Sequence, residues 1–256
     1  VAERLGVRFA HDMVAEAKSS DVVLVSVTIE KTVEVIRQVA PLMRPGSLIM
    51  DVTSIKSEPV QAMKRYAPVG VEALGTHPMF GPTMPSMHGQ TIILTPVGEK
   101  TGPWLKKISS LFQSDGANVE VLDAEEHDRI MAVVQALTHF AYIGIGSTLK
   151  ALEFDVSNSR RFMSPVYEIM IDFVGRILDQ NPELYASIQK NPQAAAVRQT
   201  FLSQCMRLCE KADSNDLEGF KQMMRQAAEH YGETHKALQR SDRVINARIG
   251  EREGRD

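Results

Sequence analysis

The sequence predicts an α/β domain with a parallel sheet, followed by an all-helical domain. Over residues 1–122, short β-branched runs alternate with helical patterns, which is typical of parallel strands joined by helices. From residue 125 onward no strand pattern persists, and apolar residues recur at helical spacing. The 256 residues are 43% hydrophobic, which is enough for two domains with a core each. Asp123 is a suitable helix N-cap, so we place the domains at residues 1–122 and 123–256.

Five strands are expected in the first domain, because five short apolar runs lie between turn or helix signals. The expected strands are residues 22–27, 47–52, 69–74, 90–94 and 118–122. The expected helices are residues 31–42, 58–65 and 104–113, with one more in residues 1–18. Two consecutive strand–helix units therefore begin the sheet.

Only helices are expected in the second domain. The first is long and contains His127 and His139, which lie about 120° apart around it by the 3.6-residue period. This separation does not favour a metal ion shared by the two histidines, and we expect no metal site. Further helices are expected in residues 166–178, 194–208 and 217–238, and the mixed-charge tail 240–256 is expected to be a solvated helix end.

Composition and charge argue against several classes of protein. The formal net charge is −3 with no long block of either sign, which does not favour binding to nucleic acid. The longest apolar runs have strand length, well short of the roughly 20 residues that cross a bilayer, so no membrane partner is expected. The N-terminal residues lack a signal-peptide core. With Cys205 and Cys209 as the only cysteines, we expect reduced thiols and a cytoplasmic protein.

One pattern is missing from the first domain. A Rossmann-type dinucleotide-binding domain normally opens with a strand, a Gly-x-Gly-x-x-Gly turn and a helix, then a second strand that ends in an acid. None of the 16 glycines forms this pattern. Either the protein is not a dinucleotide enzyme, or residues 1–122 are an incomplete Rossmann-type domain that lacks its first strand–helix–strand unit.

Residues that can bind a ligand follow the predicted strands. Parallel α/β sheets keep their ligands at the carboxyl ends of the strands. Val27 ends the first predicted strand and Thr28 follows it, and Thr53 and Ser54 follow the second, so these four are the candidate cofactor-binding residues. A helix cap is the simpler explanation for Ser54 on spacing alone.

His77 gives the sharpest chemical signal. It lies between a predicted strand end and a loop rich in proline and glycine. Its imidazole can titrate near neutral pH, with an ordinary pKa of about 6.5, and can act as a general base. The simpler alternative is that His77 only forms a hydrogen bond with the loop.

Several separated motifs together resemble the prephenate dehydrogenase family, and their form is closest to members fused to chorismate mutase. The resemblance spans nearly the whole chain. The motifs are Asp-Val-Thr-Ser-Ile-Lys at residues 51–56, Leu-Gly-Thr-His-Pro-Met-Phe-Gly-Pro at 74–82, the stretch from Glu126 to Phe140, Ser-Pro-Val-Tyr at 164–167, Val-Gly-Arg at 174–176 and Asn-Pro-Glu-Leu-Tyr at 181–185. No mutase domain is visible in these residues.

The resemblance implies roles for individual positions. His77 matches the catalytic histidine that takes the proton of the prephenate ring hydroxyl, and Ser54 matches the serine that orients it. Arg176 matches the arginine that binds a substrate carboxylate. The positions implied in substrate binding are Arg176, His139, Lys56, Tyr185 and His127. The charge of Arg176 could instead be solvated or paired with Asp172, one turn earlier.

The implied function is NAD-dependent oxidative decarboxylation of prephenate to 4-hydroxyphenylpyruvate in tyrosine biosynthesis, with NADP also open as cofactor. A homodimer through the helical domain is implied as well. Arogenate is an alternative substrate, and a non-catalytic dimeric ligand-binding remnant is the rival from another class. The sequence departs from the family in one respect, because mutase-fused members have an arginine where this chain has Glu168. That exchange is expected to alter how the substrate carboxylate is bound.

Overall fold

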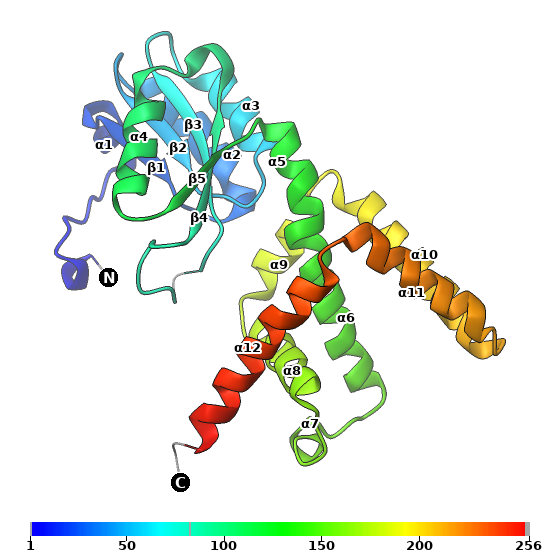
Figure 1. The fold of residues 1–256 in the computed structure, drawn as a ribbon. Coiled ribbons are helices and arrows are strands. Elements are labelled where there is room, and N and C mark those ends of the chain that lie inside the picture. Colours follow the sequence, from blue (N-terminus) through cyan, green and yellow to red (C-terminus); the bar gives the residue numbers. More distant parts are fainter. Residues whose placement is uncertain (1, 82, 254–256) are drawn as a thin grey trace. The chain divides into compact units, whose positions relative to one another are not determined.

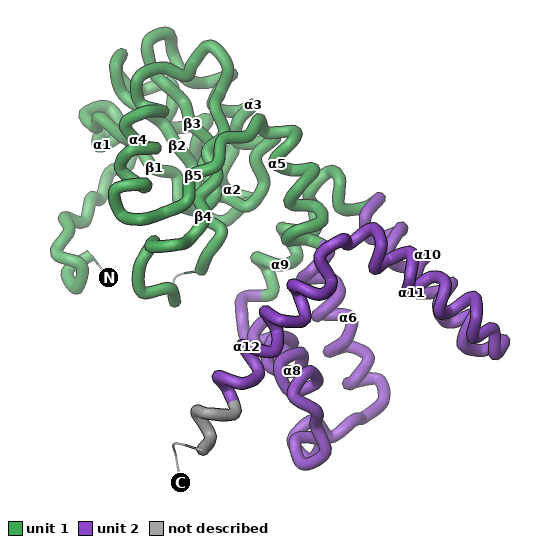
Figure 2. Tube along the Cα trace, viewed as in Figure 1, with its two compact units in different colours: residues 1–136, 182–195 green, residues 137–181, 196–256 purple. Residues whose placement is uncertain are grey.

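The computed structural model describes residues 2–81 and 83–253 and divides into two compact units (Figure 1). Unit 1 comprises Val1–Ala136 and Pro182–Ala195, and unit 2 comprises Leu137–Asn181 and Ala196–Asp256 (Figure 2). The predicted boundary at residue 123 marks the change from strands to helices, whereas the compact units divide at Ala136. Val1 of the predicted first helix, Pro82 of the histidine motif and tail residues 254–256 lie outside the described residues.

A five-stranded sheet forms the centre of unit 1, with the strand order β1-β2-β3-β4-β5. The strands are β1 Val22–Val25, β2 Leu48–Asp51, β3 Glu72–Pro78, β4 Thr91–Pro96 and β5 Asn118–Val121. All five predicted strands are present, and the predicted α/β class is confirmed. The pairs β1–β2, β2–β3 and β4–β5 are parallel, but β3 and β4 are antiparallel. The described part of their connection contains no crossover helix, so the chain returns beside β3 in the opposite direction.

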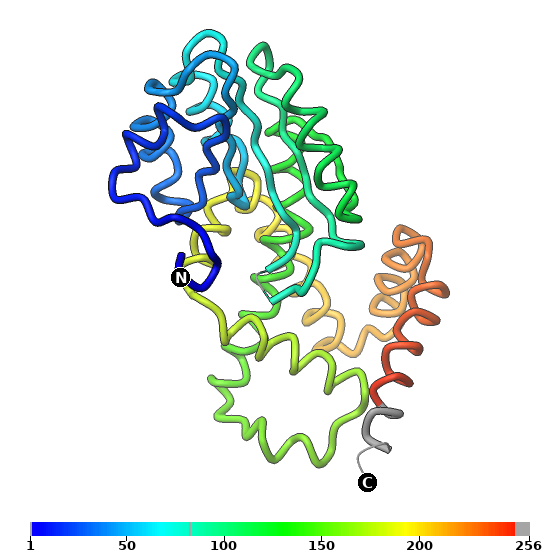
Figure 3. The backbone as a smooth tube through the Cα atoms, turned by 90° about the vertical axis from the view of Figure 1, so that its left-hand side faces the viewer, coloured from blue at the N-terminus to red at the C-terminus, as the bar shows by residue number. Residues whose placement is uncertain are grey.

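Helices cover both faces of the sheet (Figure 3). Helices α1 (Met13–Ser19), α2 (Ile29–Val39) and α3 (Ser57–Tyr66) contribute to one apolar cluster, and α4 (Pro103–Ser114) contributes to the other. Successive residues of β2 alternate between them, with Ile49 in the first cluster and Leu48 and Met50 in the second. The carboxyl end of β2 is thereby fixed from both sides.

Strand β3 begins and ends later than the sequence predicts. Residues 69–70 belong to a turn, in which Val71 N donates to Pro68 O and Gly70 has a positive φ of 86°. The strand then continues to Pro78, and His77 pairs with Ile93 of β4. His77 therefore lies within a strand, where the ladder fixes its backbone, and not between the strand end and the loop, as we expected.

The remaining elements are helical. They are α5 Ala124–Met131, a π-helix Ala132–Leu137, α6 Thr138–Ala151, α7 Val156–Ser159, α8 Pro165–Leu178, α9 Pro182–Ile188, α10 Ala194–Asp213, α11 Leu217–Tyr231 and α12 Thr234–Glu253. Asp123 is the N-cap of α5, as predicted, because its carboxylate accepts a hydrogen bond from Glu126 N at 2.8 Å. The last segment of unit 1, which includes α9, is held by Asn191, whose side chain donates to Asp128 O at 2.8 Å.

Three helix predictions were wrong in detail. The predicted helix in residues 1–18 is only a short turn, Glu3–Leu5, followed later by α1. Gly232, with a φ of 75°, ends α11, so the predicted helix at 217–238 is two helices. The π-helix Ala132–Leu137 has more residues per turn than an α-helix, so the 120° estimate for His127 and His139 does not hold.

One described helical stretch, Ala124–Ala151, is long and apolar enough to cross a membrane by length and composition. We did not expect such a stretch, because polar residues divide it into short apolar runs. Length and composition alone are weak evidence, since a core helix of a soluble protein passes the same test. Its first turns also carry His127 and Asp128, which are buried and hydrogen-bonded within unit 1.

Within unit 2, an ion-pair cluster connects three helices. Asp172 of α8 pairs with Arg160, which follows α7, at 2.9 Å, and with Arg248 of α12. Glu168, only 7% exposed on α8, lies 3.3 Å from the same Arg248 guanidinium. Glu168 is therefore charge-compensated inside unit 2, which explains how this chain accommodates an acid at the position where the sequence departs from the mutase-fused members.

Candidate active site

Polar side chains gather where β2 and β3 end, at the carboxyl edge of the sheet in unit 1. Asp51 is the last residue of β2, and Thr76 and His77 lie near the end of β3. Helix α5 adds His127 and Asp128. All five side chains are at most 2% exposed, so each needs a partner to offset the loss of water. Among the described residues no group of three or more metal-binding side chains is found.

Lys56 and Asp51 form a buried ion pair beneath this edge. Lys56 Nζ contacts an Asp51 carboxylate oxygen and donates to Thr76 O at 2.7 Å. Thr53 N donates to the same Asp51 oxygen at 2.9 Å. Burial lowers the pKa of Lys56, while the Asp51 carboxylate opposes that shift. The pair joins the loop after β2 to the backbone of β3, next to His77.

The carboxylate of Asp128 binds the N-terminus of α3 from helix α5. It accepts hydrogen bonds from Lys56 N at 2.8 Å and Ser57 N at 2.9 Å, and also from the Ser57 hydroxyl. Burial alone would raise the pKa of Asp128, but hydrogen bonds from His127, Ser57 and Lys56 hold it below its ordinary value. Asp128 is therefore an ionised acceptor at neutral pH.

His127 lies between Asp128 and His77. Its Nδ1 is 2.8 Å from an Asp128 oxygen, and its Nε2 is 2.9 Å from His77 Nδ1. The rings of His77 and His127 meet edge to face, with their centroids 5.1 Å apart. Burial, with smaller contributions from His127 and Lys56, lowers the pKa of His77 to about 3. His77 is thus neutral across the physiological pH range.

The outer nitrogen of His77, Nε2, has no hydrogen-bond partner in the described chain. It is also not among the fully buried polar atoms that lack a partner, so it keeps some exposed surface although the residue is only 2% exposed. A neutral imidazole held by one nitrogen, with the other facing outward, can accept a proton from a bound molecule. This is the chemistry that the geometry offers.

Comparison with known proteins agrees with the motifs. Residues 1–121 match the family model described as prephenate dehydrogenase, nucleotide-binding domain, and residues 123–226 match prephenate dehydrogenase, dimerization domain. The chain belongs to the prephenate dehydrogenase family. The sequence-based assignment to this family is confirmed.

Individual relatives of this family were also found. A probable arogenate/prephenate dehydrogenase of Methanocaldococcus jannaschii is 45% identical over 98% of this chain and 57% of that protein. A 4-amino-4-deoxyprephenate dehydrogenase of Streptomyces pristinaespiralis is 31% identical over 90% of this chain and 76% of that protein. The chain thus spans little more than half the length of the first of these relatives.

A solved structure shares the fold. It is prephenate dehydrogenase from Aquifex aeolicus in complex with hydroxyphenyl propionate and NAD⁺, with a TM-score of 0.72 and 21% identity. The match covers 91% of this chain and 84% of that one. At 21% identity this comparison shows a shared fold alone.

Two residues that family resemblance connects with substrate binding are enclosed in this structure. Lys56 and His127 are both 0% exposed, and the polar atoms of each are occupied by protein partners. Neither has surface through which to touch a substrate, so we assign them supporting roles.

Tyr185, the third of these residues in unit 1, lies on α9 and is 7% exposed. Sequence reasoning missed Asp51 and Asp128, the partners of Lys56 and His127, although both stand in the motifs that carry the resemblance.

The candidate cofactor-binding residues differ in exposure. Val27 and Thr28 are exposed after β1, and Thr28 is the N-cap residue of α2. Ser54 is partly exposed after β2, and no hydrogen bond of its hydroxyl is seen in the described chain. Thr53 is 4% exposed and bonded to Asp51, so it shapes the loop.

Arg176 and His139 belong to unit 2. Arg176 is exposed on α8, and its guanidinium has no ion pair in the described chain. Asp172, the alternative partner that the sequence suggested, pairs with Arg160 and Arg248 instead. Burial lowers the pKa of His139 to about 4. The structure therefore leaves Arg176 available to a ligand.

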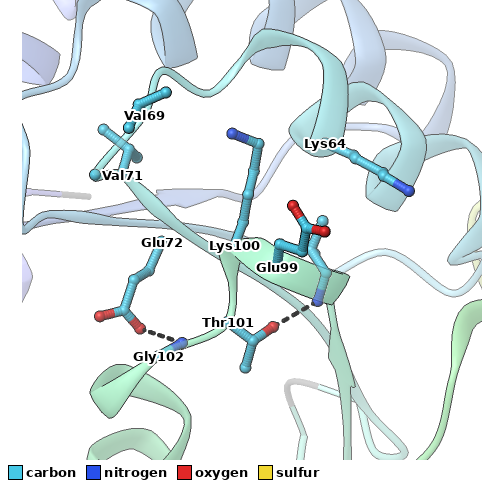
Figure 4. Close-up of a pocket in the computed structure, with 10 residues that line it drawn as sticks. Lys64, Val69, Val71, Glu72, Glu99, Lys100, Thr101 and Gly102 are labelled. Atoms are coloured by element: carbon cyan, nitrogen blue, oxygen red, sulfur yellow. Dashed lines mark hydrogen bonds between the residues drawn. The ribbon is translucent and has the colours of Figure 1, made fainter.

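A pocket at the opposite edge of the sheet lacks comparable chemistry (Figure 4). The Glu72 carboxylate, at the amino end of β3, accepts from Gly102 N at 2.9 Å and Trp104 N at 3.0 Å, which caps α4. Lys100 Nζ donates to Ala67 O at 2.7 Å. These polar groups serve the fold, so the candidate site of this family member is the His77 edge.

Gly75 of β3 leaves room for the Lys56 side chain, which packs against it. We expect Gly75→Ala to crowd Lys56 and destabilise the protein. An added Cβ would lie 3.1 Å from Thr95 and Val60 side-chain atoms and 3.2 Å from Lys56 Cδ. Overpacking of this kind costs roughly 1–3 kcal/mol, measurable as a lower free energy of unfolding in urea. The control is Gly144→Ala, whose Cβ would meet no atom within 4 Å. Wild-type stability of Gly75→Ala would contradict the close contact.

The lowered pKa of His77 predicts a pH dependence of stability. The pKa is 6.5 ordinarily and about 3 when folded, so below pH 6.5 the unfolded chain binds a proton that the folded chain does not. The free energy of unfolding should therefore fall as pH falls from 6.5, by up to about 1.4 kcal/mol per pH unit. Urea titrations at several pH values should show a shallower slope for His77→Asn. Exposed His230→Asn should keep the wild-type slope, and equal slopes for all three proteins would refute this account.

Proposed function

We propose that the protein is an NAD- or NADP-dependent dehydrogenase that converts prephenate to 4-hydroxyphenylpyruvate with loss of carbon dioxide. The observation that carries the proposal is the neutral imidazole of His77 at the carboxyl edge of the sheet. Its Nδ1 is hydrogen-bonded to His127, which leaves Nε2 without a partner in the described chain. Family membership supports the class of reaction, and the names of the relatives support the class of substrate.

His77 handles the proton of the substrate ring hydroxyl. A bound nicotinamide would supply the hydride acceptor for the carbon that carries this hydroxyl. His77 Nε2 takes the hydroxyl proton, so that a carbonyl forms at that carbon. The ring carboxylate then leaves as carbon dioxide, and its bonding electron pair makes the ring aromatic. The ring oxygen becomes a phenolate, which recovers the proton from His77, so the base is neutral again after each turnover.

The residues at the ends of β1 and β2 fit a nicotinamide cofactor. Exposed Val27 offers an apolar surface, and Thr28 and Ser54 offer hydroxyl groups at the strand ends where α/β folds bind nucleotides. The hydroxyl of Ser54 is also free to hydrogen-bond the substrate hydroxyl or His77. We assign cofactor contact to Val27, Thr28 and Ser54, with Thr53 shaping the loop.

Arg176 supplies the cation for a dianionic substrate. Its planar guanidinium can bind a carboxylate with two hydrogen bonds, and it has no competing ion pair in the described chain. His139 contributes an imidazole kept neutral by burial. Arogenate differs from prephenate by an amine in place of the side-chain ketone, and the name of the Methanocaldococcus jannaschii relative includes both. Comparing kcat/KM for the two substrates decides between them.

We also propose a cytoplasmic homodimer formed through the helical region. Residues 123–226 match the dimerization domain of the family, and α8, α10 and α11 expose large apolar side chains. Examples are Val166, Phe173, Met206, Phe220 and Met224, which are 38% to 70% exposed. Cys205 and Cys209 are free thiols, which is in keeping with a reducing compartment.

His77→Asn is expected to lower kcat by roughly 10²–10⁴-fold in the full-length protein, because asparagine cannot accept the proton. Prephenate should still bind, so KM should change little. Since the pKa of His77 is lowered to about 3, wild-type kcat/KM should stay level as pH falls from 8 to about 5. Turnover is followed through the absorbance of the reduced cofactor. A wild-type rate in His77→Asn would place the base elsewhere, with His139 next in line.

Arg176→Gln is expected to raise KM for prephenate about 30-fold or more, because the loss of a charge-assisted contact costs roughly 2–4 kcal/mol. Cofactor affinity should stay nearly unchanged. Arg225→Gln removes another exposed arginine of unit 2 and should leave KM at the wild-type value. Equal KM values for the two variants would remove Arg176 from the site.

A further inference from the structure

The two hydrogen bonds of His127 determine which of its ring nitrogens carries a proton. Each ring nitrogen has one partner, His77 Nδ1 at 2.9 Å on one side and an Asp128 oxygen at 2.8 Å on the other. At 0% exposure the ring has no access to water. A neutral imidazole donates with one nitrogen and accepts with the other, so fixing one bond fixes the second.

Asp128 fixes the first bond. Its two oxygens already accept from Lys56 N, Ser57 N and the Ser57 hydroxyl, a donor set that only an ionised carboxylate can satisfy. His127 Nδ1 must therefore carry a proton and donate it to Asp128. His127 Nε2 is then the lone-pair side of the neutral ring, and His77 Nδ1 must be the donor to it.

We propose that His127, aligned by Asp128, is a positioning residue that holds His77 in the tautomer with a proton on Nδ1 and a lone pair on Nε2. This is the tautomer that can accept a proton from a substrate hydroxyl. The opposite tautomer would present an N–H at Nε2 and could only donate. The arrangement parallels the way a buried carboxylate sets the histidine tautomer in serine proteases, with one additional imidazole between carboxylate and base. The catalytic consequence rests on the proposed function, but the tautomer itself does not.

The surrounding charges agree with this assignment. Lys56 is bound to Asp51 and donates to Thr76 O, in the residue before His77, and its charge disfavours a second proton on His77. The Asp128 charge is separated from His77 by the His127 ring, so it orders the protons without pairing directly with the base.

Two substitutions at one position separate positioning from simple packing. In His127→Gln, the amide oxygen can accept from His77 Nδ1 while the amide nitrogen donates to Asp128, so the tautomer and kcat should stay close to wild type. In His127→Phe the ring volume is kept but the acceptor is lost. We expect kcat to fall about tenfold or more with KM little changed, because His77 then populates the wrong tautomer.

The direct readout is ¹⁵N NMR of the imidazole nitrogens in the full-length, ligand-free protein, assigned with His77→Asn. We expect His77 to show a protonated Nδ1 and an unprotonated Nε2 in the wild type and in His127→Gln, and a mixture or the reverse in His127→Phe. A wild-type His77 protonated at Nε2 overturns the inference, and so does an unchanged tautomer in folded His127→Phe. If the tautomer is as expected but neither prephenate nor arogenate is oxidised, the proposed function fails and the positioning role of His127 stands.

Discussion

The carboxylate of Asp128 is the constraint on which the site depends. It accepts from the first backbone N–H groups of α3 on one side and from His127 on the other. An anion at a helix N-terminus is favourable, so the same charge both caps α3 and orders the histidine pair. Because α3 begins directly after the loop that follows β2, this one side chain sets the distance between that loop and α5. The positions of Lys56 and His127 are thus determined together.

The imidazole of His77 is uncharged, although charged groups are buried close to it. Asp51 and Lys56 compensate each other, and Asp128 is compensated by hydrogen bonds and the α3 terminus. His77 pairs directly with neither group, because Lys56 binds the Thr76 carbonyl and the His127 ring separates Asp128 from it, so desolvation keeps His77 neutral. A base prepared in this way is weak in the free protein, and it becomes effective only when a bound molecule presents its proton at hydrogen-bond distance.

Local sequence signals were sufficient for much of this architecture. The five strands, the Asp123 cap and the strand-end placement of Asp51 follow from apolar runs and capping chemistry that involve residues close in sequence. The antiparallel β3–β4 pair and the roles of Lys56 and His127 depend on contacts between distant segments, such as that of Lys56 N with Asp128, which is 72 residues away. The spacing of apolar residues along the sequence gives no information about such long-range contacts. Lys56 was expected to bind the substrate from the family resemblance alone, and the compensating Asp51, which allows a lysine to be fully buried, was not considered.

The pairing of Glu168 with Arg248 bears on how the family diverges. A nearly buried glutamate on α8 is tolerable because α12 brings a guanidinium to 3.3 Å from it. In a relative with arginine at the position of Glu168, a second arginine at the position of Arg248 would face a like charge across the same short gap. The two positions, 80 residues apart in the chain, are therefore expected to co-vary during evolution, with the acid and the C-terminal arginine gained or lost as one unit.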